Sequence, residues 1–225
     1  MKGYYEDKLS AERLKLCYEI ATPRIQQYLK AEIEHVLEAI HPGDVVLELG
    51  CGYGRIIPFL AKKASLVIGI DNSLASLLSG LNYLKGFTNC HLAAMNAFNL
   101  EFQDEIFDCV VCIQNGISAF HVNRQDLIRE SFRVTKPGGI MLFSSYSGRF
   151  WKERLQWFQL QSEAGLVGEI DWEKTKYRVI VCRDGFTANS VGAEEFLSLT
   201  AGLDVKAKIV EVDESSLFCE VVRCK

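Results

Sequence analysis

The sequence has little that would direct the chain to a membrane or to nucleic acid. No apolar run approaches the roughly 18 residues that span a bilayer, and residues 1–15 are charged and lack the apolar centre of a secretory signal. Positive charge is not in excess either, since 25 Lys and Arg face 29 Asp and Glu, for a formal net charge of −4. We therefore expect a cytoplasmic protein with no membrane partner and no DNA partner.

The sequence also lacks the residue clusters that hold metals. Eight cysteines are scattered along the chain, and Cys109 and Cys112 have the spacing of a zinc or redox pair. That pair lies inside an apolar segment, DCVVCI, and no second Cys pair or Cys/His cluster completes a tetrahedral site. A chain of 225 residues with 48% hydrophobic residues can bury one good core without disulfides. We expect buried free cysteines and no metal.

What the sequence does contain is a regular alternation of apolar and amphipathic segments. This alternation predicts a parallel sheet covered by helices on both faces. We expect strands at 44–49, 65–71, 90–94, 106–114 and 140–146, helices at 55–63, 73–85 and 125–134, and a turn at 136–139.

The two ends of the chain differ from this alternating centre. Residues 10–40 have helical periodicity, and Thr22 followed by Pro23 is typical of a helix start. Residues 205–212 and 217–222 are joined by so short a link, 213–216, that they can pair only as antiparallel strands. One helical face after Pro23 collects the apolar residues Ile25, Tyr28, Leu29, Ile33, Val36, Leu37 and Ile40.

Residues 147–186 interrupt the alternation. They contain all three tryptophans and four further aromatic residues, and they predict a helix at 150–164 and a hairpin around Asp184 and Gly185. An insertion after the fifth strand lies at the carboxyl edge of a parallel sheet, where ligands bind. We interpret this segment as a lid over a substrate, while its aromatic residues would equally serve as a small core of its own.

A glycine-rich turn follows the first strand of the sheet. The strand ends in Glu48, and Gly50, Gly52 and Gly54 then alternate in the segment ELGCGYGR. Glycines at the carboxyl end of a parallel strand let the backbone approach a nucleotide-like ligand. A dinucleotide fingerprint, G-x-G-x-x-G, would require a third glycine where Arg55 stands. An NAD(P)-dependent oxidoreductase on a related fold therefore remains only as an alternative.

The motif E-x-G-x-G-x-G resembles the class I, Rossmann-like S-adenosylmethionine-dependent methyltransferases, and the likeness extends over about 40–146 and 190–225. The resemblance implies an α/β, three-layer sandwich with a mostly parallel seven-stranded sheet and an antiparallel C-terminal strand. It implies one domain over 1–225, with an N-terminal helical cap (1–43), a cofactor-binding core (44–146), the lid insertion (147–186) and a C-terminal helix and hairpin (187–225).

S-adenosylmethionine, released as S-adenosylhomocysteine, is the cofactor that the resemblance implies. The glycine turn would cradle its amino-acid part, with Glu48 helping to orient it. Asp71 ends the second strand, where a carboxylate can accept hydrogen bonds from ribose hydroxyls or instead cap the next helix. Asn96 stands where the family usually has Asp to receive the adenine amine. The cofactor-binding residues expected are Glu48, Gly50, Cys51, Gly52, Gly54, Asp71, Asn72, Asn96, Ala97 and Gln114.

No catalytic residue is assigned from the sequence. His121 is a candidate general base, or merely a loop residue. Arg24 and Arg55 are candidates for the cofactor carboxylate, with surface charge as the alternative for each. Tyr4, Tyr5 and Tyr18 are expected either to cover the site or to pack an N-terminal helix.

The methyl acceptor is expected to be a small molecule, although a protein or tRNA is not excluded. Signatures of amino and cytosine-C5 methyltransferases are missing after the fourth strand, where the chain reads IQNGISAF. A non-catalytic protein that binds S-adenosylmethionine is the second alternative.

Overall fold

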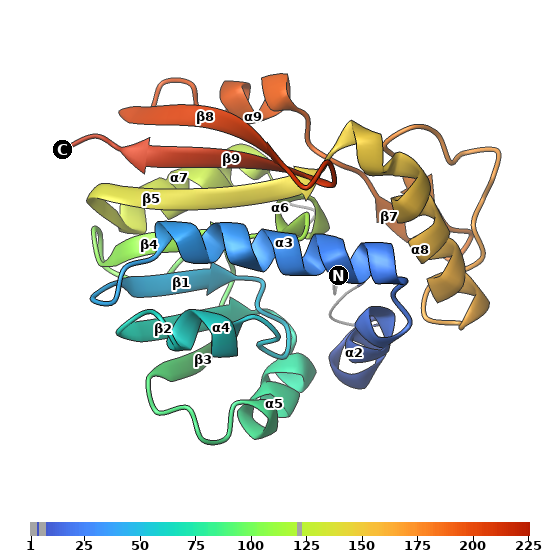
Figure 1. Ribbon diagram of the computed structural model, residues 1–225, viewed down its shortest axis with the longest axis horizontal. Coiled ribbons are helices and arrows are strands. Elements are labelled where there is room, and N and C mark those ends of the chain that lie inside the picture. The colour runs from blue at the N-terminus through green and yellow to red at the C-terminus, as the bar shows by residue number, and fades with distance from the viewer. Residues whose placement is uncertain (1–3, 5–7, 121–122) are drawn as a thin grey trace.

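The computed structural model describes residues 4, 8–120 and 123–225, and its centre is a seven-stranded sheet (Figure 1). The strand order is β3-β2-β1-β4-β5-β9-β8, and only β9 runs antiparallel to the others among these described strands. The strands are β1 (Val45–Leu49), β2 (Leu66–Asp71), β3 (Cys90–Ala94), β4 (Phe107–Cys112), β5 (Thr135–Tyr146), β8 (Val205–Val212) and β9 (Ser216–Arg223). This topology confirms the predicted fold class.

Helices cover the sheet on both faces and complete three layers. Apolar residues alternate along β1, so that Val46 packs with α3 and α4 on one face while Leu47 packs with α7 and α9 on the other. The helices are α2 (Ala11–Glu19), α3 (Pro23–Ala39), α4 (Ile57–Ala61), α5 (Leu74–Tyr83), α6 (Gly116–Ala119), α7 (Arg124–Val134) and α9 (Ala193–Thr200).

The start of α3 confirms the helix start predicted at Thr22 and Pro23. The Thr22 side chain accepts a hydrogen bond from the backbone N–H of Ile25, and Pro23 is the first helical residue, where its missing N–H costs nothing. All of the apolar face predicted for this helix is buried except Leu37, which is partly buried. The same face also carries a fully buried acid, Glu32, which the apolar pattern did not predict.

The strand order reverses between β2 and β4, on either side of β1. In the register, Glu48 lies opposite Gly69 of β2 and Val111 of β4. The chains leaving β1 and β4 therefore separate at the carboxyl edge, which opens a crevice at a topological switch point. The glycine turn lies at that point.

The insertion stands beside the N-terminal helix, at the edge of the sheet toward which β1 points (Figure 1). It contains η1 (Gly148–Phe150), α8 (Trp151–Glu163) and the hairpin of β6 (Ile180–Val181) and β7 (Thr187–Ala188). Leu9 and Cys17 of the N-terminal segment share one apolar cluster with Phe158 and Phe186 of the insertion. The two segments thus form one structural unit although about 130 residues separate them in the sequence.

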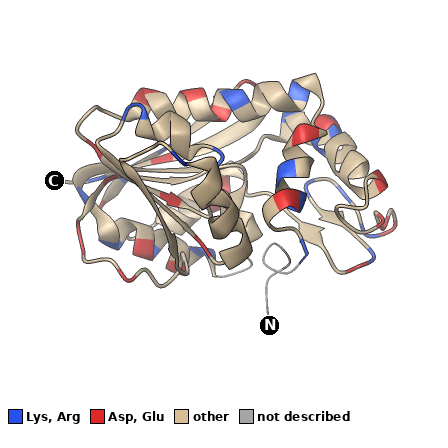
Figure 2. Cartoon of the chain, turned by 90° about the horizontal axis from the view of Figure 1, so that it is seen from below, with Lys and Arg blue, Asp and Glu red and all other residues tan. Residues whose placement is uncertain are grey.

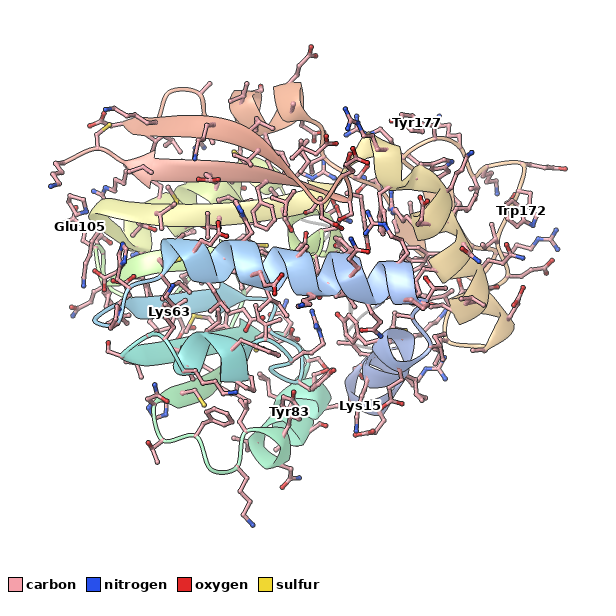
Figure 3. All side chains as sticks on the ribbon, viewed as in Figure 1. Lys15, Lys63, Tyr83, Glu105, Trp172 and Tyr177 are labelled. Carbon is pink, nitrogen blue, oxygen red and sulfur yellow. The ribbon has the colours of Figure 1, made fainter. Side chains whose placement is uncertain are left out.

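Most aromatic residues of the insertion do not face the crevice. Phe158 and Phe186 are buried in the shared cluster, whereas Trp172 and Tyr177 are 57% and 59% exposed and point outward (Figure 3). Some of the aromatic residues in the insertion therefore form a small core, as the alternative interpretation expected.

Two predicted boundaries are wrong. The turn expected at 136–139 lies within β5, because Thr135 already pairs with Phe107 before the register shifts and resumes at Ile140 opposite Cys109. Gly138, at φ +82°, supplies the left-handed backbone of this irregularity. The helix expected at 55–63 is reduced to α4, since tight turns occupy the residues before Ile57.

Charge is spread without a basic face in the view of Figure 2, where Lys and Arg are interspersed with Asp and Glu along the helices. Among the helices described, none is both long and apolar enough to cross a bilayer.

Gly69→Ala is expected to destabilise the fold by roughly 1–3 kcal/mol, because the added Cβ would lie 2.6 Å from Ile57 Cδ1 and 2.9 Å from Cys51 Sγ. Gly43→Ala is the matched control, since nothing lies within 4 Å of its Cβ. Urea denaturation of both variants checks this, and equal stabilities for the two would contradict the tight packing beneath the glycine turn.

Candidate functional site

A cavity of about 670 Å³ lies at the carboxyl edge of the parallel strands. Its floor consists of residues that follow β1, β2, β3 and β4, including Gly50, Asp71, Asn96 and Gln114. Its roof comes from the N-terminal segment, α6 and α8. The cavity therefore brings together most of the residues predicted to bind the cofactor, and it lies between the core and the insertion.

The glycine turn is shaped by left-handed backbone. Gly50 and Gly52 have φ values of +71° and +56° and line the cavity. A Cβ on Gly50 would lie 2.7 Å from the ring of Phe120, so a side chain there would close the space. Gly54 also has a positive φ, but its Cβ would meet Leu84, and it lines neither the cavity nor its side recess.

Asp71 ties the glycine turn to the second strand. Its Oδ2 accepts a 2.8 Å hydrogen bond from the Gly52 N–H, and its Oδ1 accepts one of 2.7 Å from the Ser73 N–H. The N-cap of α5 is Ser73, whose Oγ accepts from Ser76 N–H, so Asp71 is not the capping residue. Asn72 lies beside it on the cavity wall.

The third strand contributes one end of the cavity. Asn96 and Ala97 line it together with Ile70 and Phe98. Among the described residues, the Asn96 Oδ1 accepts one long hydrogen bond, 3.5 Å, from the Phe98 N–H. This end therefore combines the apolar side chains of Ile70 and Phe98 with one amide.

A recess of about 40 Å³ extends from the cavity behind the glycine turn, lined by Glu48, Cys51 and Arg55 among others. Glu48 Oε2, Arg55 Nε and Nη2, and Gln114 Nε2 are buried there without hydrogen-bond partners in the described part of the chain. The Arg55 guanidinium carbon stands 4.6 Å from the centre of the Tyr18 ring. One buried acceptor and three buried donors therefore meet in one small space, where Arg55 also interacts with the hydroxyl of Tyr18 and with Glu48.

The electrostatics of the recess are unbalanced. Burial raises the pKa of Glu48 from 4.5 to about 8, the charge of Arg55 acts in the opposite direction, and the charge of Asp71 adds to the rise. Buried polar atoms normally have partners, so this set fits a ligand that brings both a cation and an anion. An amino-acid zwitterion has that chemistry.

The two arginine candidates separate in the structure. Arg55 borders the recess, whereas Arg24 donates a 2.6 Å hydrogen bond to Asp213 and stacks on Phe150 elsewhere. Tyr18 lines both spaces, while Tyr4 hydrogen-bonds Asp184 at 2.6 Å. The predictions for His121 and Tyr5 lie outside the described residues.

The sequence did not single out several residues of the cavity wall, although Trp157 lies in the segment predicted as a lid. Tyr146 at the end of β5 and Trp157 and Gln161 of α8 line it, as does Phe120. In the helix 150–164 predicted from the sequence, Trp157 and Gln161 are four residues apart and so share a face. That spacing predicts a shared helix face, but it does not show that this face lines the cavity.

Across 4, 8–120 and 123–225, no group of three or more His, Cys, Asp or Glu side chains is arranged to hold a metal ion. Cys109 and Cys112 are buried within β4, and all eight cysteines are free.

The unliganded protein is expected to lose stability as pH rises from about 5 to about 8. The folded state holds the proton of Glu48 up to about pH 8, while the unfolded chain releases it near 4.5. The stabilisation is therefore complete below the unfolded pKa and is lost as pH passes the folded one. Glu48→Gln should flatten this fall and be roughly 2–4 kcal/mol more stable than the wild type at the alkaline end.

Urea denaturation at a series of pH values measures this, with the exposed Glu12→Gln on α2 as the control. The fall should shrink without vanishing, because burial also raises the pKa of Glu32 to about 7. Parallel curves for wild type and Glu48→Gln would contradict the prediction.

Comparison with known proteins agrees with this geometry. The family model described as a methyltransferase domain matches residues 46–139. A malonyl-[acyl-carrier protein] O-methyltransferase from Marinomonas sp. is 31% identical over 144 residues, which are 60% of this chain and 52% of that protein. A demethylmenaquinone methyltransferase from Corynebacterium kroppenstedtii is 36% identical over 106 residues, 47% of this chain and 43% of that protein. The chain thus spans about half the length of these relatives.

The solved structures agree on the fold. The crystal structure of PH0226 protein from Pyrococcus horikoshii OT3 superposes with a TM-score of 0.66 at 20% identity, and the match covers all of both chains. The strand order and the solved structures show the Rossmann-like fold of class I methyltransferases, and residues 46–139 match a methyltransferase domain.

Proposed function

We propose that the protein binds S-adenosylmethionine and transfers its methyl group to a small-molecule acceptor. The observation that carries the proposal is the set of unpartnered polar atoms behind the glycine turn. Glu48 Oε2 would accept a hydrogen bond from an ammonium, and Arg55 Nε and Nη2 would donate to a carboxylate. S-adenosylmethionine ends in an amino acid that brings both of these groups, whereas a pyrophosphate brings no cation for Glu48.

The remaining predicted residues fit the other parts of the same ligand. Gly50, Cys51 and Gly52 would form the backbone cradle, with Gly54 supporting it by its tight packing on Leu84. Asp71 and Asn72 would receive the ribose hydroxyls, and Asn96 and Ala97 would face the adenine. Gln114 lies where these walls meet, so its side-chain amide would contact the amino-acid end.

The chain's contribution to the reaction is positioning and exclusion of water. When bound, S-adenosylmethionine supplies a methyl group already activated by its sulfonium. The aromatic side chains of Tyr18, Tyr146 and Trp157 line the cavity and would enclose that cation. Their rings would not compete with the methyl acceptor for the methyl group. Alignment of two reactants in this manner can lower a barrier by ~7–11 kcal/mol.

The roof of the cavity supports a neutral, flat and largely apolar acceptor. Tyr146, Trp157 and Phe120 form its walls, and Gln161 adds one amide. Within the described residues, Asp71 is the one charged side chain that lines the cavity, and it lies at the ribose end. We assign 147–186 as the substrate lid, acting together with the N-terminal cap (1–43) over the core (44–146), in a single domain completed by 187–225.

Isothermal titration tests the cofactor proposal. The wild type is expected to bind S-adenosylmethionine and S-adenosylhomocysteine with micromolar affinity and to show no binding of NAD(H). Arg55→Met should weaken S-adenosylhomocysteine by roughly 10- to 100-fold, because a charged hydrogen-bond donor to the carboxylate is lost. Arg24→Met is the matched control and should bind normally, since Arg24 pairs with Asp213. Binding of NAD(H) alone would overturn the proposal.

A methyl-transfer screen tests the acceptor class. With labelled S-adenosylmethionine, neutral aromatic alcohols, thiols and amines should be methylated in preference to their carboxylated counterparts. For the best of them, Gln161→Leu should raise KM several-fold and leave the dissociation constant of S-adenosylhomocysteine unchanged, whereas the exposed Gln159→Leu on the same helix should change neither. Tight cofactor binding with no turnover across the panel would favour a non-catalytic binding protein, and labelling only of protein or tRNA would replace the small-molecule acceptor.

A further inference from the structure

The chain leaves β4 through two consecutive residues with left-handed backbone. Gln114 and Asn115 have φ values of +57° and +61°, and neither is glycine. Residues other than glycine, and glutamine more than asparagine, adopt this conformation at a cost, so the surrounding structure must hold it in place. Gln114 borders both the cavity and the recess, which puts this strained turn at the centre of the site.

A buried acid far away in the sequence holds the first of these residues. The Gln114 N–H donates to Glu32 Oε2 at 2.9 Å and to Ser144 Oγ at 2.8 Å. Asn115 is held separately, because its Oδ1 accepts from Ser145 Oγ at 2.6 Å. Glu32 and Ser144 therefore share the N–H of the residue that faces the recess, and of the two only Glu32 comes from outside β5.

Glu32 is costly for the fold. It is fully buried on the apolar face of α3, and its second oxygen accepts a hydrogen bond from Ser216 Oγ at the start of β9. Burial raises its pKa to about 7, against the opposing effect of its hydrogen bonds. Since moving an ionisable group out of water is costly, packing alone does not explain a carboxylate here.

The side chain of Gln114 has one partner and one free end. Tyr18 donates its hydroxyl to Gln114 Oε1 at 3.1 Å, which sets the orientation of the amide. Gln114 Nε2 is then left buried without a partner among the described residues, beside the similarly unpartnered Arg55 nitrogens. Backbone and side chain of one residue are thus fixed from two helices, α3 and α2.

We propose that Glu32 is a positioning residue that holds the Gln114 backbone so that its side-chain amide donates, with Arg55, to the carboxylate of the bound ligand's amino-acid end. This inference rests on the proposed cofactor. Glu32 touches no ligand itself, and it acts through the N–H of Gln114. Its effect should accordingly be confined to ligands that carry the amino-acid end.

A comparison of two ligands tests this directly. S-adenosylhomocysteine carries the amino-acid end, and 5′-methylthioadenosine has the same nucleoside without it. By isothermal titration, Glu32→Met should weaken S-adenosylhomocysteine about 10-fold or more and change 5′-methylthioadenosine by less than about 2-fold. Glu32→Gln retains one acceptor oxygen and should restore most of the lost affinity. Gln114→Leu should show the same selective loss as Glu32→Met.

The matched control is His35→Leu, one turn further along α3. His35 also joins this helix to β9, through a 3.1 Å hydrogen bond to Glu220, but it does not reach Gln114. The His35→Leu variant should have a lower unfolding temperature but the same affinity ratio for the two ligands.

Glu32→Asp shortens the side chain by one methylene and should also show the selective loss. This variant tests the positioning role if Glu32→Met does not fold.

The outcomes separate the two proposals. If the wild type binds neither ligand, the proposed cofactor fails, and the role of Glu32 fails with it. If the wild type binds both, but the Glu32 variants weaken both equally or neither, the cofactor stands and the positioning role is overturned. A ratio that changes only in the Glu32 and Gln114 variants is the result expected.

Discussion

The reversal of strand order at β1 is the constraint on which the site depends. Because β2 and β4 flank β1, and the connections that follow β1 and β4 run to opposite faces of the sheet, the carboxyl end of β1 and its turn lie at the bottom of a crevice. That turn must be tight and must not fill the cavity with side chains, which the left-handed glycines Gly50 and Gly52 allow. Asp71, one strand away, then fixes the turn through the Gly52 N–H.

The crevice contains buried polar atoms for which the described part of the chain supplies no hydrogen-bond partner. Glu48, Arg55 and Gln114 each leave a buried atom without a partner in the part of the chain described. Each such atom lowers the stability of the unliganded fold, and a ligand that satisfies it returns that stability as affinity. The affinity for such a ligand and the lower stability of the unliganded protein therefore have the same origin. The same reasoning applies to the strained backbone of Gln114, whose conformation is maintained by Glu32.

The sequence was sufficient to predict the sheet, the glycine turn and Asp71, because these depend on contacts between neighbouring segments and on a spacing that few structures share. It was not sufficient to choose between Arg24 and Arg55, since the choice depends on Asp213, which is 189 residues from Arg24. Glu32 was missed for the same reason, because its partners Gln114 and Ser216 lie 82 and 184 residues away. The bulge in β5 was missed because KPGG predicts a turn, and only pairing with β4 shows that the strand continues.

The helices over the cavity connect its two ends physically. Tyr18 of α2 contacts Gln114 and Arg55 at the recess, while Trp157 of α8 lines the part of the cavity that we propose for the acceptor. The two helices are joined where Trp157 Nε1 donates a 2.9 Å hydrogen bond to the Cys17 carbonyl, next to Tyr18. They also share a buried apolar cluster. A ligand that contacts Tyr18 would therefore be linked through this packing to the wall that the proposed acceptor would meet.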